Sequence, residues 1–155
     1  KPVQGNYHPL TMFTLAVNYS LSGIKPWSYH FLNIVLHLLN TFLVFRLMLK
    51  LTRDNNIISL TSSLLFGVHP MHVESVAWIS ERKDVLYSFF FLLGLISYLR
   101  YLDSGKRSAY YITLLWFLLS LASKPAAVIF PIVLLIFDFF TNTYVNLCIF
   151  SPTYM

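Results

Sequence analysis

Long apolar runs alternate with short polar stretches along most of the chain. The apolar runs cover residues 27–51, 57–68, 85–102, 110–122 and 126–140. Ahead of them, Phe13, Ala16, Val17 and Leu21 recur at helical spacing within residues 12–21, which predicts a short interfacial helix. Inside a bilayer every backbone polar group needs an internal partner, so spanning segments of this kind form helices. The pattern predicts an all-α polytopic membrane protein, a bundle of about five membrane helices.

Helix-breaking and polar residues predict the boundaries of the elements. Gly23 and Pro26 separate the interfacial helix from the first long run, and residues 52–56 and 103–108 are turn sequences. We divide the chain into residues 1–25, a loop with the interfacial helix, residues 26–140, the membrane helix bundle, and residues 141–155, an atypical tail consistent with truncation. Because no leader pattern follows Lys1, we expect an internal piece of a longer protein.

The amino-acid composition indicates whether water or lipid surrounds the protein. The chain is 57% hydrophobic and only 11% charged, whereas soluble proteins are about 25% charged. The net charge of +5, from 11 Lys and Arg against 6 Asp and Glu, favours lipid headgroups and anionic lipid-linked ligands as partners over nucleic acid. The single cysteine, Cys148, excludes an internal disulfide. A soluble domain is therefore excluded, and membrane lipid is the expected environment.

Two features predict where polar groups meet the membrane. The runs 57–68 and 110–122 reach only about 20 Å across a hydrocarbon core of roughly 30 Å, which favours a recessed site in a protein-lined cavity.

Basic residues near two turns predict that these turns are cytoplasmic. The residues are Arg46, Lys50 and Arg53 at one turn and Arg100, Lys106 and Arg107 at the other. Lys1, Lys25, Arg82, Lys83 and Lys124 then lie on the exoplasmic side. Lys and Arg usually concentrate on the cytoplasmic side, so their presence on the exoplasmic side suggests that they bind an anionic ligand.

The polar block at residues 69–84 is the strongest candidate for a site. Charge concentrated beside apolar helices is costly, so it points to function. A helix from Pro70 predicts Glu74, Trp78 and Glu81 along one face, where the carboxylates meet a polar substrate. Lys124, between Ser123 and Pro125 at a helix start, is suited to bind phosphate. Arg82 and Lys83 are further phosphate candidates, with a neutralised interfacial ion cluster as the alternative.

The histidines allow two interpretations. His69, His72 and Glu74 are metal-binding residue types, but Pro70 interrupts a regular helical His pair and no further strong ligand follows nearby. A hydrogen-bonded turn is therefore favoured over a metal site. On the long run, the side chains of His30, Asn33, His37 and Asn40 form a polar stripe. Hydrogen bonds between helices are the favoured interpretation of the stripe, with lining of a substrate cavity as the alternative for His30.

In order along the chain, several motifs together resemble one family. They are Tyr7-His8-Pro9-Leu10-Thr11, residues 27–40, His69-Pro70-x-His72-x-Glu74-x-Val76-Ala77-Trp78-Ile79-Ser80-x-Arg82-Lys83-Asp84, and Ser123-Lys124-Pro125 with Pro131 and Asp138. Residues 5–140 resemble the membrane domain of bacterial tetratricopeptide-repeat proteins related to the TMTC-type O-mannosyltransferases. The specific part is the block from His69 to Asp84.

The resemblance implies a partial GT-C-like helical bundle with short exoplasmic interfacial helices. It implies transfer of a sugar from a polyprenyl-phosphate donor to Ser/Thr hydroxyls of a protein acceptor, at the periplasmic face of a bacterial inner membrane. No cofactor is expected; a divalent metal is the less favoured alternative. The family's first membrane helix, its catalytic acid and its repeats do not appear in the chain, so we expect the base upstream of Lys1 and an inactive piece.

Combined with this resemblance, the residues receive expected roles. Lys124, Arg82 and Lys83 stabilise the departing lipid phosphate. Glu74 and Glu81 bind acceptor or sugar hydroxyls, His8 and His72 orient the substrate, Trp78 stacks on the sugar, and His30 lines the cavity. Two other classes stay open at this point: a non-catalytic polytopic scaffold or transporter segment, in which the same charges gate a cavity, and a metal-dependent membrane hydrolase.

Overall fold

A computed structural model describes residues 8–139, and all of its regular elements are helical. The elements are α1 (Pro9–Ser22), α2 (Pro26–Leu51), α3 (Asn56–Val68), α4 (Met71–Ala77), the 3₁₀ turn η1 (Ile79–Glu81), α5 (Arg82–Ser104), α6 (Arg107–Ser123) and the 3₁₀ turn η2 (Pro125–Ile129). Residues 130–139 continue as a helix. The predicted tail at 141–155, Cys148 and Lys1 lie outside the described residues.

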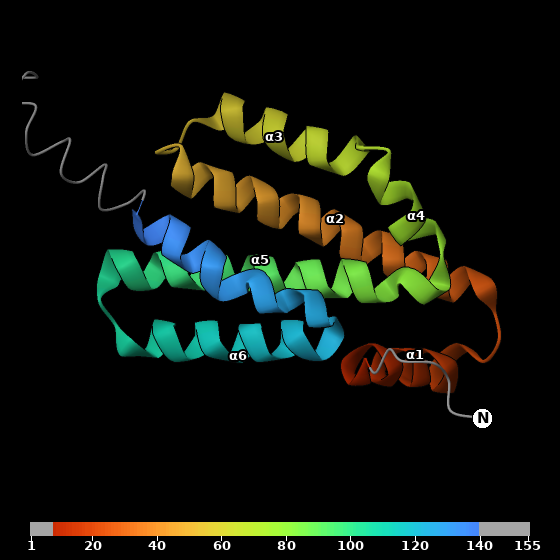
Figure 1. The fold of residues 1–155 in the computed structure, drawn as a ribbon. Helices are drawn as coiled ribbons and strands as arrows, with labels where there is room; N and C mark the ends of the chain where they lie inside the picture. The colour runs from red at the N-terminus through yellow and green to blue at the C-terminus, as the bar shows by residue number, and fades with distance from the viewer. Residues whose placement is uncertain (1–7, 140–155) are drawn as a thin grey trace, which may run out of the picture.

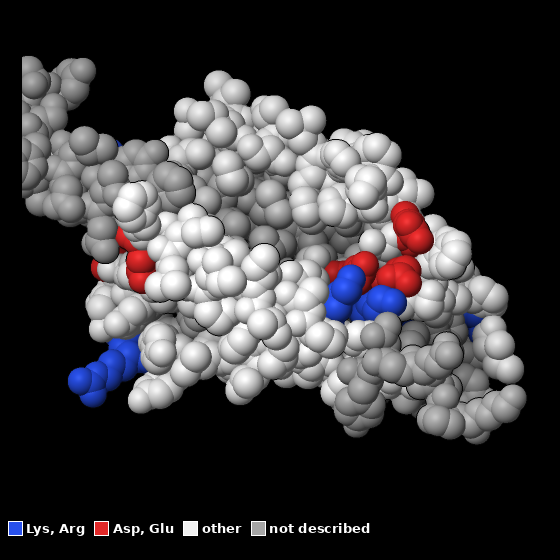
Figure 2. Space-filling view, in the orientation of Figure 1, with Lys and Arg blue, Asp and Glu red and all other residues white. Residues whose placement is uncertain are grey.

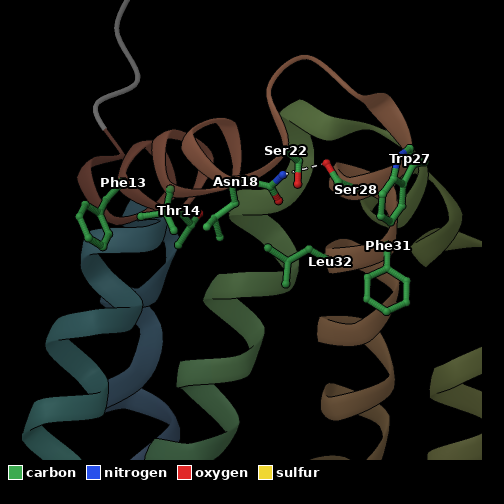
Figure 3. A pocket seen from close by; sticks show the side chains of 10 residues that line it. Phe13, Thr14, Asn18, Ser22, Trp27, Ser28, Phe31 and Leu32 are labelled. Atoms are coloured by element: carbon green, nitrogen blue, oxygen red, sulfur yellow. Dashed lines mark hydrogen bonds between the residues drawn. The ribbon is translucent and has the colours of Figure 1, made fainter.

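The helices run back and forth between two ends of the molecule (Figure 1). Helices α2 and α3 form one antiparallel hairpin, α5 and α6 form another, and α2 packs against α5 between them. The basic turns predicted at 52–56 and 103–108 occur at 52–55 and 105–106. Both lie at one end of the molecule, here called the turn end, where Lys50 Nζ and Asp103 Oδ2 lie 2.8 Å apart. The opposite end, the block end, carries α4, η1, the start of α5 and the end of α6. Helix α1 crosses over it (Figure 3).

Local sequence explains where the helices begin and end. Pro occupies the first turn of α1, α2 and η2, where its missing N–H costs nothing. The Asn55 side chain caps α3 by accepting from Ile58 N at 3.2 Å. Gly105 ends α5 with φ 64°, a left-handed conformation that favours glycine. The predicted turns are thus present, and the helix α1 lies where a short helix was predicted, whereas the last predicted helix begins as the 3₁₀ turn η2. The interfacial location of α1 stays a prediction.

The packed core lies where α5 meets α2, α6 and residues 130–137. Its buried members are Leu47, Leu95, Ile96, Leu99 and Phe130. Gly94 allows the closest approach, because a Cβ at that position would lie 2.8 Å from Cζ of Phe130. A larger side chain there would push Phe130, only 2% exposed, out of its place. The close contact fixes the 130–139 helix against α5.

Apolar side chains also cover much of the outside. Two helices, Pro26–Leu51 and Ile79–Ser104, are long and apolar enough to cross a membrane, while Asn56–Val68 and Pro125–Phe139 are shorter apolar helices. Large apolar residues such as Phe31, Leu38 and Phe42 of α2 are exposed. Such a surface is unstable in water and suits lipid. The predicted number of about five membrane helices stays a prediction.

Candidate functional site at the block end

The polar block folds into a short bent segment rather than one helix. Helix α3 ends at His69, which is extended (φ −64°, ψ 127°) as expected for a residue that precedes proline. A single helix from Pro70 through Glu81 was predicted, and this prediction is wrong, because Trp78 is extended (φ −93°, ψ 127°) between α4 and η1. Glu74 and Glu81 therefore do not share one regular helix face.

A side chain of α2 compensates for the break at Trp78. Asn33 Nδ2 donates to the carbonyl oxygens of Val76 at 3.4 Å and Trp78 at 3.2 Å. These carbonyls lose their helical partners where α4 ends, and an unpaired buried carbonyl is costly. Asn33 is itself completely buried. The predicted polar stripe is therefore used for hydrogen bonds between helices at Asn33, as it is at Asn40, whose Nδ2 donates to the Val85 carbonyl at 2.8 Å.

Arg82 is the most buried charge of the block, with 0% of the residue exposed. Its Nε donates to Asn33 Oδ1 at 3.0 Å, and Nη2 donates to Asn18 Oδ1 at 3.3 Å and to the Tyr29 carbonyl at 3.1 Å. Its Nη1 lies 3.5 Å from the Thr14 carbonyl. One guanidinium thus joins α5 to α1 and α2.

All of these partners of Arg82 are neutral, and no carboxylate of the described residues pairs with it. Burying a cation costs several kcal/mol unless hydrogen bonds or an anion compensate. Here amide and carbonyl dipoles provide the compensation, and the positive charge is retained beneath the block. Its predicted contact with a phosphate stays a prediction, because in this conformation the guanidinium has no exposed surface.

The two lysines at the block end each face a carboxylate. Lys83 Nζ lies 3.2 Å from Glu81 Oε1, with the side chains 22% and 23% exposed. Lys124 Nζ donates to Asp84 Oδ1, with the side chains 32% and 27% exposed. Figure 2 shows acidic and basic side chains gathered together at this end of the molecule. The structure therefore brings Lys83 and Lys124, 41 positions apart in sequence, to one end of the bundle.

The position of Lys124 follows from the end of α6. Its backbone is extended (φ −154°, ψ 132°) between Ser123 and Pro125, as a residue before proline should be. Thr11 Oγ1 donates to the Ser123 carbonyl at 3.2 Å, which attaches α1 to this corner. Lys124 thus projects beside the start of α5.

Three histidines gather on the other side of the block. The His72 ring lies 4.4 Å from the Phe66 ring, 5.5 Å from His37 and 6.1 Å from His69, between centroids. His37 Nε2 lies 3.0 Å from the Gly67 carbonyl, so this nitrogen carries a proton and donates. Burial lowers the pKa of His72 below the ordinary 6.5, and the neighbouring His37 and His69 lower it further. His72 is therefore neutral at pH 7.

The remaining predicted residues differ in accessibility. Glu74 and Trp78 are exposed, Trp78 at 60%, and His30 is half-buried on α2. His8, at the start of α1, has both ring nitrogens buried with no hydrogen-bond partner among the described residues. Within residues 8–139, no three His, Cys, Asp or Glu side chains are arranged to hold a metal ion.

Asn18 and Ser28 are site residues that the sequence did not reveal. Both are buried, and Asn18 Nδ2 donates to Ser28 Oγ at 3.0 Å. They border a largely apolar cavity of about 430 Å³ between α1 and α2, whose wall includes Phe13, Trp27 and Phe31 (Figure 3). A polar Asn18 among the apolar residues of α1 was the only available signal, and its partner Arg82 lies 64 positions away.

Comparisons with known proteins give a consistent result. Residues 2–152 match a family model described as dolichyl-phosphate-mannose-protein mannosyltransferase. The chain is 44% identical over 95 residues to human protein O-mannosyl-transferase TMTC3, covering 61% of this chain and 10% of that protein. It is 41% identical over 100 residues to human TMTC1, covering 64% and 11%, and 35% identical over 130 residues to mouse TMTC4, covering 75% and 18%.

The chain thus spans between a tenth and a fifth of the length of these curated relatives. No solved structure matches it significantly.

Proposed function

The chain belongs to the dolichyl-phosphate-mannose-protein mannosyltransferase family, and from this premise we propose that it forms the phosphate-binding part of a membrane glycosyltransferase. The proposed donor is a polyprenyl-phosphate sugar, and the acceptor is a Ser or Thr hydroxyl of a protein at the exoplasmic face. The two candidate membrane helices and the similarity to protein O-mannosyl-transferases support this proposal. The resemblance inferred from the motifs at 69–84 and 123–125 agrees with this family.

The proposed reaction is a displacement at the anomeric carbon of the donor sugar. The acceptor oxygen forms a bond to this carbon while the bond from the carbon to the phosphate oxygen breaks. The bonding pair leaves with the lipid phosphate, and the hydroxyl proton passes to a base. We assign the base to a carboxylate outside residues 8–139. Negative charge grows on the leaving phosphate, so cations placed there lower the barrier more than they stabilise the bound donor.

Lys124 is the cation that carries the proposal. Its ammonium is partly exposed and is held beside the start of α5 by a single carboxylate, that of Asp84. A phosphate that leaves with two charges attracts a lysine more strongly than one carboxylate does. We infer that Lys124 moves from Asp84 to the phosphate as the bond breaks. Lys83, similarly paired with Glu81, is the second proposed phosphate ligand.

Arg82 has a different role in this proposal. Its guanidinium is hydrogen-bonded within the protein, so it acts as a positioning residue that holds α1 and α2 against the start of α5. The buried positive charge also raises the potential near Lys83 and Asp84. Both effects favour an anion at the block end.

The sugar and the acceptor are proposed to lie over the exposed part of the block. Glu74 and Glu81 accept hydrogen bonds from hydroxyl groups, and Trp78 offers an exposed ring for stacking on the sugar. His72, neutral at pH 7, and His8, whose ring nitrogens have no described partner, are proposed to orient the substrate. His30, which is not among the residues that line the cavity between α1 and α2, stays a proposed lining residue of the substrate site.

The test uses the full-length protein in lipid vesicles, with a polyprenyl-phosphate mannose donor and a Ser/Thr acceptor peptide. Lys124→Ala should lower kcat about 100-fold, the usual consequence of losing one group that stabilises transition-state charge. Lys25→Ala is the matched control, because Lys25 is an exposed lysine before α2 that has no ion pair with the described residues. Equal turnover of the Lys124→Ala and Lys25→Ala proteins would remove Lys124 from the phosphate role.

A further inference from the structure

A second cavity lies at the turn end, between the last two turns of α5 and the first two turns of α6. Its volume is about 320 Å³, and its lining residues are Ser97, Arg100, Asp103, Ser104, Lys106, Ser108, Ala109 and Ile112. Three serines and two cationic side chains therefore line a cavity at the opposite end of the bundle from Lys124. The mannosyl transfer proposed above uses none of these residues.

The charges around this cavity are not balanced. Among residues 8–139, the one carboxylate that lines it belongs to Asp103, and its Oδ2 lies 2.8 Å from Lys50 Nζ. Arg100 and Lys106 are both exposed and have no ion pair among residues 8–139. Figure 2 shows basic side chains projecting at this end of the molecule. With Asp103 neutralised, the cavity retains two cations without counterions in the part of the chain that the structure describes.

The backbone of the turn holds these cations in place. Ser104 Oγ donates to the Arg100 carbonyl at 2.7 Å and accepts from Lys106 N at 3.4 Å. Gly105 then directs the chain into α6 with φ 64°. The first turn of α6 has no side-chain cap, so its free N–H groups add positive potential to the same cavity.

The position of the cavity at the end of an apolar helix indicates where its ligand comes from. It lies at the end of Ile79–Ser104, one of the two helices able to cross a membrane, where lipid headgroups are located. Ile112, 45% exposed, adds an apolar side chain to the same lining. We propose that this cavity binds the phosphate of an anionic membrane lipid, with Arg100 and Lys106 as the ligands of its headgroup.

Lipid binding is tested with the full-length protein in nanodiscs that contain phosphatidylcholine and a small fraction of phosphatidylglycerol. Retention of phosphatidylglycerol is measured by mass spectrometry of the protein released from the discs. The variant Arg100→Gln/Lys106→Gln should reduce the preference for phosphatidylglycerol about 30-fold, since each cation near the surface contributes about fivefold. Both side chains are exposed, so helix content by circular dichroism should not change.

The control for general charge attraction is Arg46→Gln/Lys25→Gln. It removes the same charge from two exposed residues that do not line the cavity. An equal loss of preference in this control, or no loss in the cavity variant, would overturn the site. Binding of inorganic phosphate to the delipidated protein distinguishes the two sources of phosphate. If inorganic phosphate bound with the same affinity as phosphatidylglycerol, the proposal that a lipid is the ligand would be overturned.

Discussion

The buried guanidinium of Arg82 allows the most direct test of how the block end is held together. Replacing Arg82 with Ala removes hydrogen bonds to Asn33, Asn18 and Tyr29. It also leaves their oxygens without a donor, in a place where the residue had 0% exposure. Each hydrogen bond to a charged group contributes about 1.5–3 kcal/mol. The substitution also removes the free-energy cost of burying a cation, and this gain offsets part of the summed loss of hydrogen-bond free energy.

We therefore expect Arg82→Ala to lower the free energy of unfolding by about 3–5 kcal/mol. In a chain of this size such a change shifts the melting temperature by about 10–15 °C. The assay is thermal unfolding in detergent, followed by helix content and intrinsic fluorescence at one fixed scan rate. Because α1 is attached to α5 through this side chain, protease accessibility of residues 19–25 should rise in the same variant.

Lys83→Ala is the matched control for this measurement. Lys83 is the adjacent residue, carries the same charge and forms a single part-exposed ion pair with Glu81 at 3.2 Å. Such pairs contribute about 0–1 kcal/mol. A melting shift for Arg82→Ala no larger than the shift for Lys83→Ala would refute the conclusion that the buried network holds the block end together.

Two further predictions concern the packing and the pH dependence of the fold. Gly94→Ala should destabilise the protein by about 1–3 kcal/mol, because the added Cβ lies 2.8 Å from Phe130; a melting temperature equal to that of the parent protein would contradict this contact. Because the pKa of His72 is lowered in the folded chain, the unfolded chain binds more protons than the folded chain below about pH 6.5. The free energy of unfolding should therefore be fully present above pH 6.5 and should fall as the pH drops below that value. In His72→Gln the melting temperature should depend less on pH over this range, and an unchanged dependence would exclude His72 as its source.

Several parts of the fold could be predicted because they depend on neighbouring residues alone. Pro26, Asn55 and Gly105 mark helix starts and ends through their own backbone preferences. The turn sequences predicted at 52–56 and 103–108 lie where the two hairpins reverse direction. The stripe with Asn33 and Asn40 predicted hydrogen bonds between helices, and the structure confirms this at both positions.

The break at Trp78 could not be read from the local sequence. Nothing between Met71 and Glu81 is a strong helix breaker. The extended residue is stable because Asn33, which lies on α2, satisfies the carbonyls of Val76 and Trp78. A partner 45 positions away is outside the range of any helix rule. The helix prediction therefore failed at the point where a tertiary hydrogen bond replaced a local one.

By itself, the sequence determined that this protein is helical, that its apolar helices suit a membrane, and that its motifs are those of a mannosyltransferase family. Only the tertiary structure decided what each charge of the block does. Arg82 and Lys83 are neighbours with the same charge, yet one is buried among neutral hydrogen-bond partners and the other is part-exposed beside Glu81. Burial and partners depend on α1 and α2, which pack against the start of α5 from distant parts of the chain. The role of a charged residue is therefore set by the dielectric and the donors and acceptors around it, which the linear sequence does not contain.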